Sequence, residues 1–242
     1  MTLGLVLYHQ ISYGVLTGKE ILNRVDKNYE SSTRIALSTM IIKGERETRT
    51  LKIKSWGQGL DKTFSVYLSP PRDKGTKMLK IKDELWTYSP DADRTIKIAG
   101  HMLRQSMSGS DVSYEDFLQD PILSNSYEPK LTGEDTLKGR ACYQLELKAI
   151  KDDVAYSSRK LWVDKERFMP LKQELYAKSG KLLKVFIIDE VFKVKNRWYP
   201  KKMNYKDVML KGDGTEIIVD SIEFDVAIPE YIFTKASLRA DK

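Results

Sequence analysis

Apolar and polar positions alternate with a period of two over most of the chain after residue 33, in short stretches rich in β-branched and aromatic residues. Turn sequences separate these stretches, such as the proline- and glycine-rich residues 70–75 and the Lys-Gly-Asp-Gly sequence at 211–214. The alternation predicts strands at residues 35–43, 48–56, 63–68, 76–81, 84–89, 95–98, 128–134, 141–150, 158–164, 171–177, 181–191, 198–209 and 215–224.

The predicted fold class is therefore mainly β. A sheet of a dozen or so antiparallel strands does not stay flat, and we expect it to curl into a barrel or half-barrel. No linker and no shift in composition divides the sequence, which predicts one domain over residues 17–242.

A helix is predicted to open this domain. The sequence Thr17-Gly18-Lys19-Glu20 has the spacing of a capping box, in which the threonine hydroxyl and the glutamate carboxylate satisfy free amides of the first turn. Ile21, Leu22 and Val25 then fall on one face. A second helix is predicted at residues 229–238, with a proline in its first turn.

Residues 100–120 interrupt the strand pattern. Three flexible apolar residues, Met102, Leu103 and Met107, lie in its irregular first half. In the second half, Ser113 begins a capping sequence for a short helix that runs through Leu118. A loop and helix of this length within a run of strands is usually functional or a lid.

The charge suggests an anionic partner, because the net charge is +7 and the pI is about 9.2. The lysines nevertheless alternate with apolar residues, which is typical of the solvent side of strands and argues against a nucleic-acid site. The examples are Lys52, Lys54, Lys77, Lys80, Lys82, Lys201, Lys202 and Lys206.

Residues 1–16 are rich in apolar residues, interrupted by His9 and Gln10, and carry no Lys, Arg, Asp or Glu. We interpret them as the remnant of a secretory signal that lacks its basic start, and Ser12-Tyr13-Gly14 offers a small-x-small cleavage site. The alternative is an ordinary N-terminal strand or helix.

Signatures of an enzyme are few. The two histidines, His9 and His101, are far apart, and the sequence has no metalloprotease, nucleophile-elbow, P-loop or dinucleotide motif. The single cysteine, Cys142, cannot form an internal disulfide and is predicted to be a small buried hydrophobe. We therefore predict no catalytic residue, no metal site and no cofactor.

Aromatic and aliphatic residues on the strands suggest an apolar lining instead. The residues predicted to line the concave side of the curled sheet are Met40, Ile42, Phe64, Val66, Trp86, Tyr88 and Trp162. The residues predicted to form a lid over them are Met102, Leu103, Met107, Phe117 and Leu118. The alternative is that all of these residues fill a dry core.

Two motifs resemble one family. The strand sequence Leu85-Trp86-Thr87-Tyr88-Ser89-Pro90 resembles a hairpin strand of the periplasmic lipoprotein carrier LolA, and residues 161–171, Leu-Trp-Val-Asp through Pro-Leu, resemble a strand–turn–strand motif of LolA-like and LolB-like proteins. Residues 74–79 and 100–116 resemble a bacterial branch of outer-membrane lipoprotein-sorting proteins. The resemblance spans residues 18–240.

This resemblance implies an incomplete antiparallel barrel whose lid helices cover a cavity for acyl chains. It also implies a periplasmic, non-catalytic carrier that takes lipoprotein acyl chains or lipid toward the outer membrane, with an inner-membrane transporter as donor and an outer-membrane acceptor. We expect a monomer that binds no nucleic acid. Two other functions stay open: a protein-interaction module with a filled core, such as a sensor or an accessory subunit of an RND-type lipid exporter, and a hydrolase of envelope polymers.

Overall fold

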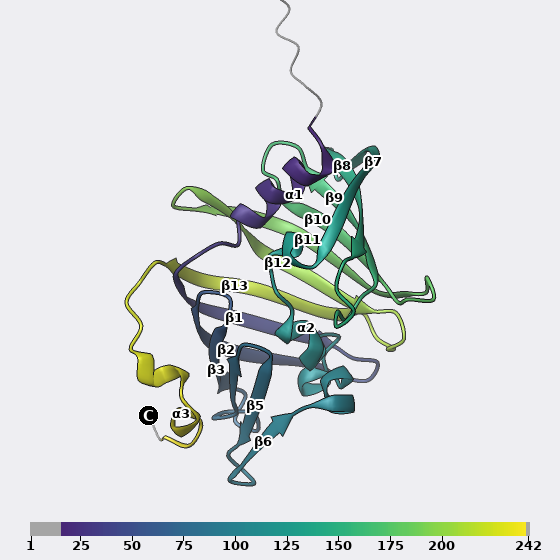
Figure 1. Cartoon of the computed structure of the whole chain (residues 1–242). Helices are drawn as coiled ribbons and strands as arrows, with labels where there is room; N and C mark the ends of the chain where they lie inside the picture. The colour runs from purple at the N-terminus through teal and green to yellow at the C-terminus, as the bar shows by residue number, and fades with distance from the viewer. Residues whose placement is uncertain (1–15, 241–242) are drawn as a thin grey trace, which may run out of the picture.

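The computed structural model describes residues 16–240, and its main feature is one large antiparallel sheet (Figure 1). The proposed signal remnant, residues 1–16, lies outside the described residues except for Leu16. The strands are β1 (Thr33–Lys43), β2 (Thr48–Gln58), β3 (Lys62–Ser69), β4 (Lys77–Ile81), β5 (Glu84–Ser89), β6 (Arg94–Ile98), β7 (Tyr127–Leu137), β8 (Arg140–Ala149), β9 (Ser158–Asp164), β10 (Pro170–Tyr176), β11 (Leu182–Val194), β12 (Arg197–Asp207) and β13 (Gly214–Phe224).

The sheet is curled but not closed. Its strand order is β6-β5-β4-β3-β2-β1-β13-β12-β11-β10-β9-β8-β7, so within the described residues β6 and β7 are unpaired edges. The first strand pairs with the last, with Met40 opposite Ile217, and this pairing joins two consecutive meanders. The prediction of a mainly β, half-open barrel is confirmed.

Helix α1 (Gly18–Lys27) covers the inner face of one half of the sheet. The predicted capping box is present: the Thr17 amide donates to Glu20 at 2.7 Å, and the Glu20 amide donates to the Thr17 hydroxyl at 3.2 Å. Its apolar face buries Ile21, Leu22 and Val25 against side chains of β7, β8 and β9.

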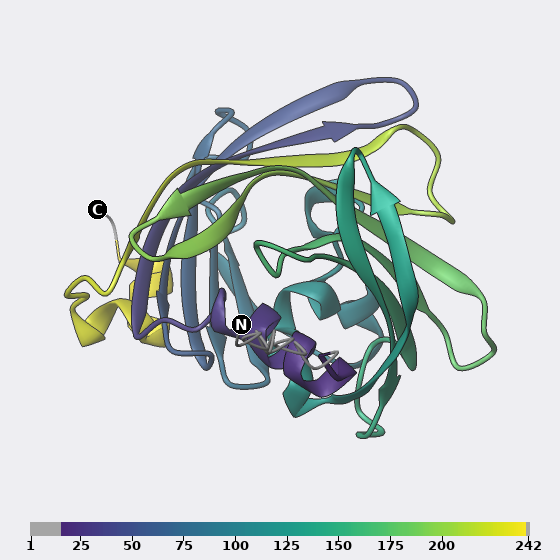
Figure 2. The ribbon, with the colours of Figure 1, turned by 90° about the horizontal axis from the view of Figure 1, so that it is seen from above.

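A stretch that we call the crossing segment, residues 99–126, joins the two edge strands β6 and β7. It contains the 3-10 helices η1 (Gly100–Arg104), η2 (Met107–Gly109) and η3 (Leu123–Asn125) and the short helix α2 (Tyr114–Leu118). Viewed from above, α1 and the helices of this segment lie inside the curve of the sheet (Figure 2).

The C-terminal segment, residues 225–240, lies on the outer side (Figure 2). The predicted single helix is two short ones, η4 (Glu230–Phe233) and α3 (Lys235–Arg239), because Thr234 between them has an extended backbone. Ile232, Phe233 and Leu238 pack on Phe64 and on neighbouring strand residues. Among residues 16–240, every helix is too short or too polar to cross a bilayer.

Candidate functional site

The five predicted lid residues and two predicted lining residues lie together on the inner face. Met40 and Ile42 of β1 belong to one buried cluster with Met107 and Val112 of the crossing segment, and these four side chains are only 5–7% exposed. The other predicted lid residues, Met102, Leu103, Phe117 and Leu118, are partly buried against the same cluster. The crossing segment therefore covers an apolar inner surface, and its side chains fill the space beneath it.

Four other predicted lining residues occupy the opposite face of the sheet. Phe64, Val66, Trp86 and Tyr88 belong to the cluster beneath the C-terminal segment. Their neighbours Tyr67 and Leu85 belong to the inner cluster, as the alternation of side chains along a strand requires. The expectation that these residues line the concave side is therefore wrong.

Trp162 also points outward. Its chain neighbours Leu161 and Val163 point inward and pack against α1 in a second buried cluster. Its indole N–H donates to Asp135 at 2.9 Å, and the Lys172 ammonium lies 4.3 Å from its ring centroid. The tryptophan thus contacts polar side chains on the outer face.

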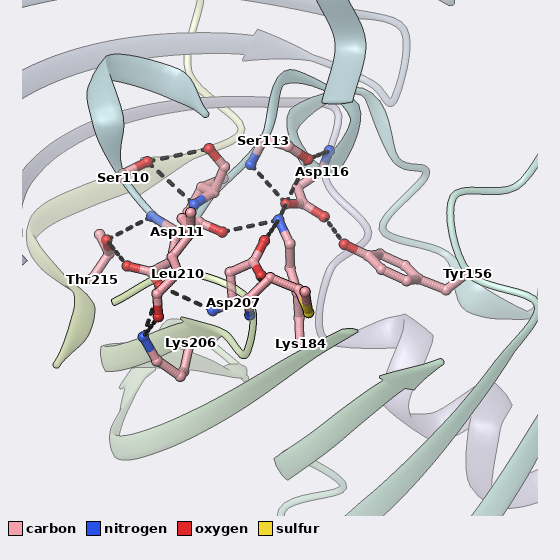
Figure 3. A network of polar contacts seen from close by, with 12 residues as sticks. Ser110, Asp111, Ser113, Asp116, Tyr156, Lys184, Lys206, Asp207, Leu210 and Thr215 are labelled. Carbon is pink, nitrogen blue, oxygen red and sulfur yellow. Dashed lines mark hydrogen bonds and ion pairs between the residues drawn. The ribbon is translucent and has the colours of Figure 1, made fainter. Parts of the chain in front are cut away.

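The crossing segment is held to the sheet by a buried lysine, Lys184 of β11 (Figure 3). Its ammonium lies 2.5 Å from the Asp116 carboxylate of α2 and donates to the backbone carbonyl of Asp111 at 2.9 Å. It also lies 3.7 Å from the Asp207 carboxylate at the end of β12. The phenol of Tyr156 donates to the second oxygen of Asp116 at 2.6 Å.

Asp111 adds a second set of contacts from the same segment. Its amide donates to the Thr215 hydroxyl and its carboxylate accepts from that hydroxyl, both at 2.9 Å. The other carboxylate oxygen accepts from the Asp207 amide at 2.9 Å. We call Asp111, Asp116, Tyr156, Lys184, Asp207 and Thr215 the lysine latch.

Three more cations of the sheet bind the crossing segment. Arg49 of β2 donates to the carbonyl of Ser108 at 3.2 Å, and Lys80 of β4 donates to that of Leu118 at 3.0 Å. Arg159 of β9 donates to the side chain of Gln119. The sequence pattern placed Lys80 on the solvent side of its strand; this is wrong, because the residue is buried beneath α2.

The environment shifts the pKa values of the latch and its neighbours. Burial favours the protonated form of Asp116, but the Lys184 charge and the hydrogen bonds from Lys184, Tyr156 and Ser113 outweigh it and hold the pKa below its usual value. Burial and the nearby Asp116 carboxylate raise the pKa of Tyr156. Burial lowers the pKa of Lys80.

Two clefts flank the crossing segment. One, of about 570 Å³, lies beside the latch and is lined by residues that include Leu103, Tyr156, Lys184 and Met209. The other, of about 370 Å³, includes Leu103, Leu118, Tyr127, Val154 and Arg159. Leu103 lines both, so movement of η1 would alter both openings.

The carboxylates of this region are neutralised by lysine. Asp116 and Asp207 both contact the same lysine, Lys184. Hydrolysis of a glycosidic bond needs a different arrangement, in which two carboxyl groups flank the substrate. In the described part of the chain, no three His, Cys, Asp or Glu side chains are grouped to hold a metal ion. Cys142 is buried and unpaired with any other cysteine, and burial raises the pKa of its thiol.

Sequence reasoning missed the latch. The capping sequence at Ser113 identified α2 and placed Asp116 in its first turn, and the Ser113 amide and hydroxyl each donate to Asp116 at 2.8 Å. Nothing local distinguishes Lys184 from the exposed lysines of other strands. Lys184 lies between two apolar residues, Leu183 and Val185, but so does the exposed Lys52, between Leu51 and Ile53.

The comparisons with known proteins agree with this architecture. A family model described as an uncharacterized protein matches residues 59–240. A DUF1329 family protein from Desulfovibrio piger ATCC 29098 is 24% identical, with a TM-score of 0.84 over 91% of this chain and 97% of that chain. No curated protein matches the sequence.

Two further solved structures are similar. A putative outer membrane lipoprotein-sorting protein domain from Vibrio parahaemolyticus is 24% identical, with a TM-score of 0.80 over 92% of this chain and 98% of that one. A LolA superfamily protein from Nitrosomonas europaea is 21% identical, with a TM-score of 0.76 over 92% of this chain and all of that one (100%). The chain belongs to the DUF1329-like family and has the fold of LolA superfamily proteins.

Proposed function

We propose that this protein is a non-catalytic carrier in the periplasm, which binds acyl chains of lipoproteins or lipids between the inner face of its sheet and the crossing segment. The observation that carries the proposal is how this segment is attached. It covers the apolar cluster around Met40 and Met107, and the side chains of Arg49, Lys80, Arg159 and Lys184 hold it in place. Such a cover can detach without unfolding a strand.

Burial of an acyl chain provides the driving force. Each methylene removed from water contributes ~0.8 kcal/mol, so a chain of about a dozen methylenes contributes on the order of 10 kcal/mol before the costs of binding. Met40, Met102 and Met107 are suited to such a ligand, because methionine adapts its shape to irregular apolar surfaces. The four cations that hold the segment would then control access and release.

The direction of transport is part of the proposal. The similarity to the lipoprotein-sorting protein domain from Vibrio parahaemolyticus supports cargo bound for the outer membrane. The carrier would act as a monomer, take its cargo from an inner-membrane transporter and pass it to an outer-membrane acceptor. It would bind no nucleic acid.

One observation favours a second function, a protein-interaction module such as a sensor or an accessory subunit of an RND-type lipid exporter. The cluster beneath the crossing segment is already filled, since Met40, Ile42, Met107 and Val112 are almost fully buried against one another. A permanently filled core would bind partners through its surface and carry no lipid.

Native mass spectrometry of protein purified from the periplasm, followed by organic extraction, separates the two functions. The carrier predicts a bound acyl lipid that is lost in Met107→Asp and retained in Ile150→Asp, since Ile150 is 59% exposed and lines neither cleft. Circular dichroism checks that both variants are folded. An apo mass for the wild-type protein, with no uptake of added lipid, would contradict the carrier and favour the interaction module.

A further inference from the structure

Arg159 of β9 is a buried cation that forms no ion pair within the described part of the chain, residues 16–240. Only 6% of the residue is exposed. Its guanidinium donates to the side chain of Gln119 and lies 4.7 and 5.6 Å from the ring centroids of Tyr127 and Tyr156. Its Nε atom is buried without a hydrogen-bond partner. The protein therefore uses only part of the hydrogen-bonding capacity of this guanidinium.

A second buried cation on the same face of the sheet shows what Arg159 lacks. Lys184 lies in the same row, because Leu175 of β10 is opposite both residues. Lys184 is equally buried but contacts the carboxylates of Asp116 and Asp207. A charge taken out of water costs free energy unless an opposite charge or hydrogen bonds replace its hydration. A ligand with an anionic group would give Arg159 the compensation that Lys184 receives from the protein.

Arg159 has space for such a ligand beside it. It lines the cleft of about 370 Å³ at the crossing segment, a volume within the range of pockets that bind small molecules, roughly 300–1,000 Å³. Leu103 and Leu118 of the crossing segment and Val154 line the same cleft. The cleft thus adjoins the surface that we propose for acyl chains, and it places a buried cation beside apolar side chains.

The other charged residues of the cleft are more exposed than Arg159. Four carboxylates line it: Asp83, Glu115, Asp120 and Asp153. Asp83 and Asp153 are exposed, and the other two are half-buried. Among the described residues that line the cleft, the exposed Lys151 is the one other cation. The charge therefore changes from positive where the cleft is most buried to mainly negative where it is exposed.

This distribution of charge selects the ligand chemistry. A purely anionic group would meet four carboxylates, and a purely cationic group would leave Arg159 without compensation. A zwitterionic group with an inner phosphate and an outer ammonium suits both ends of the cleft. Guanidinium matches the geometry of phosphate with two parallel hydrogen bonds, and an ammonium gains from carboxylates at the exposed end.

We propose that this cleft binds a phosphoethanolamine group, with its phosphate at Arg159 and its ammonium at Asp83 and Asp153. The group is the head of a phospholipid whose acyl chain lies beneath the crossing segment. This inference rests on the proposed carrier function and names the chemical class of its cargo. Soluble phosphoethanolamine carries the same two charges, so the test includes it.

Titration calorimetry compares lysophosphatidylethanolamine with lysophosphatidylglycerol, both with one myristoyl chain and below their micelle concentrations. We expect the ethanolamine lipid to bind about fivefold more tightly, in line with the energy of partly exposed ion pairs. Soluble phosphoethanolamine should bind far more weakly than either lipid. Equally tight binding of the soluble compound would overturn the lipid as its source. Equal affinity for the two lipids overturns the head-group site and leaves the carrier standing, whereas no binding of either overturns both.

Arg159→Met tests the phosphate contact. It should weaken binding of both lysolipids on the order of tenfold, the worth of hydrogen bonds to a charged group, and leave binding of uncharged monomyristoylglycerol unchanged. Lys160→Met should change lysolipid binding less than about twofold, because Lys160 is exposed on the same strand and lies outside the lining of this cleft. Equal weakening for monomyristoylglycerol would show that Arg159 only holds the crossing segment, and would overturn the site.

The ammonium contact is tested by Asp83→Asn combined with Asp153→Asn. The double variant should lose the preference for the ethanolamine lipid over the glycerol lipid. Asp152→Asn is the matched control and should keep this preference, because Asp152 is exposed beside Asp153 but lies outside the lining of the cleft. A preference that survives in the double variant, or that Asp152→Asn removes equally, overturns the placement of the ammonium.

Discussion

Lys184 of β11 places its ammonium 2.5 Å from the carboxylate of Asp116 in α2, and only 8% of either side chain is exposed. The pair joins the centre of one sheet meander to the segment that connects the two sheet edges. Removal of one partner from a buried ion pair typically costs about 3–5 kcal/mol, because the other charge stays buried without compensation. The latch is therefore the point at which a small change should release the crossing segment.

Lys184→Met should loosen the crossing segment without unfolding the sheet. The substitution leaves Asp116 buried beside Tyr156 with no cation, so we expect the local stability of the segment to fall by about 3 kcal/mol. Amide exchange at residues 107–118 should then be on the order of 100-fold faster. Hydrogen–deuterium exchange measures this directly. Lys181→Met is the matched control, because Lys181 is exposed in the turn before the same strand.

If the amides of residues 107–118 exchange no faster in Lys184→Met than in the wild type, the latch does not hold the segment. Equal acceleration throughout the sheet would show that Lys184 supports the whole fold and has no selective role.

Acid should open the latch through Asp116. Because the pKa of Asp116 is lower in the folded protein than its ordinary value, the folded state favours the charged form, and the stability gained is present at neutral pH and lost as pH falls through the folded pKa. This stability is therefore lost below about pH 4, near the ordinary pKa of an aspartate side chain. Urea unfolding from pH 7 to pH 2.5 measures it.

The comparison for this experiment is Asp116→Asn. The difference in unfolding free energy between wild type and variant should be constant at neutral pH and shrink below about pH 4. A difference that does not vary with pH would exclude Asp116 as the titrating group.

The strands could be predicted from the sequence because their signals are local. Alternation and turn residues placed the strands to within a few residues, and the capping sequences at Thr17 and Ser113 placed the starts of α1 and α2. The capping sequences depend on hydrogen bonds between residues only three positions apart, so they can be recognised in the sequence.

The faces of β3–β5 could not be predicted, because both are buried. Met78 and Leu79 are adjacent and both buried, as are Leu85 and Trp86. When two neighbouring residues are both apolar, alternation no longer indicates which one points inward. The C-terminal segment covers the outer face, and only the tertiary structure reveals this.

The family motif at residues 161–171 has a structural role that can be tested. The Asp164 side chain is fully buried and forms an ion pair with Arg140. It also accepts hydrogen bonds from the backbone amides of Glu166 and Arg167, at 2.9 and 3.1 Å. Asp164→Asn should lower the free energy of unfolding by roughly 2 kcal/mol, the typical worth of a hydrogen bond to a charged group. Urea denaturation measures the change.

Glu166→Gln is the control for Asp164. Glu166 also pairs with Arg140, at 2.7 Å, but its side chain is 80% exposed, so its loss should cost less than about 1 kcal/mol. Equal effects of the two substitutions would contradict the structural role assigned to the buried aspartate.

Photo-methionine labelling tests the carrier function most directly, because it reports on the covered surface with little change to the packing. The diazirine analogue replaces methionine throughout the chain, and irradiation with dilauroyl phosphatidylglycerol attaches lipid wherever an acyl chain lies against a methionine. The carrier predicts lipid adducts at Met40, Met78, Met102 and Met107, the methionines at or beneath the crossing segment, and none at the buried Met169 of another cluster. Adducts confined to the exposed Met209, or no adducts at all, would contradict it.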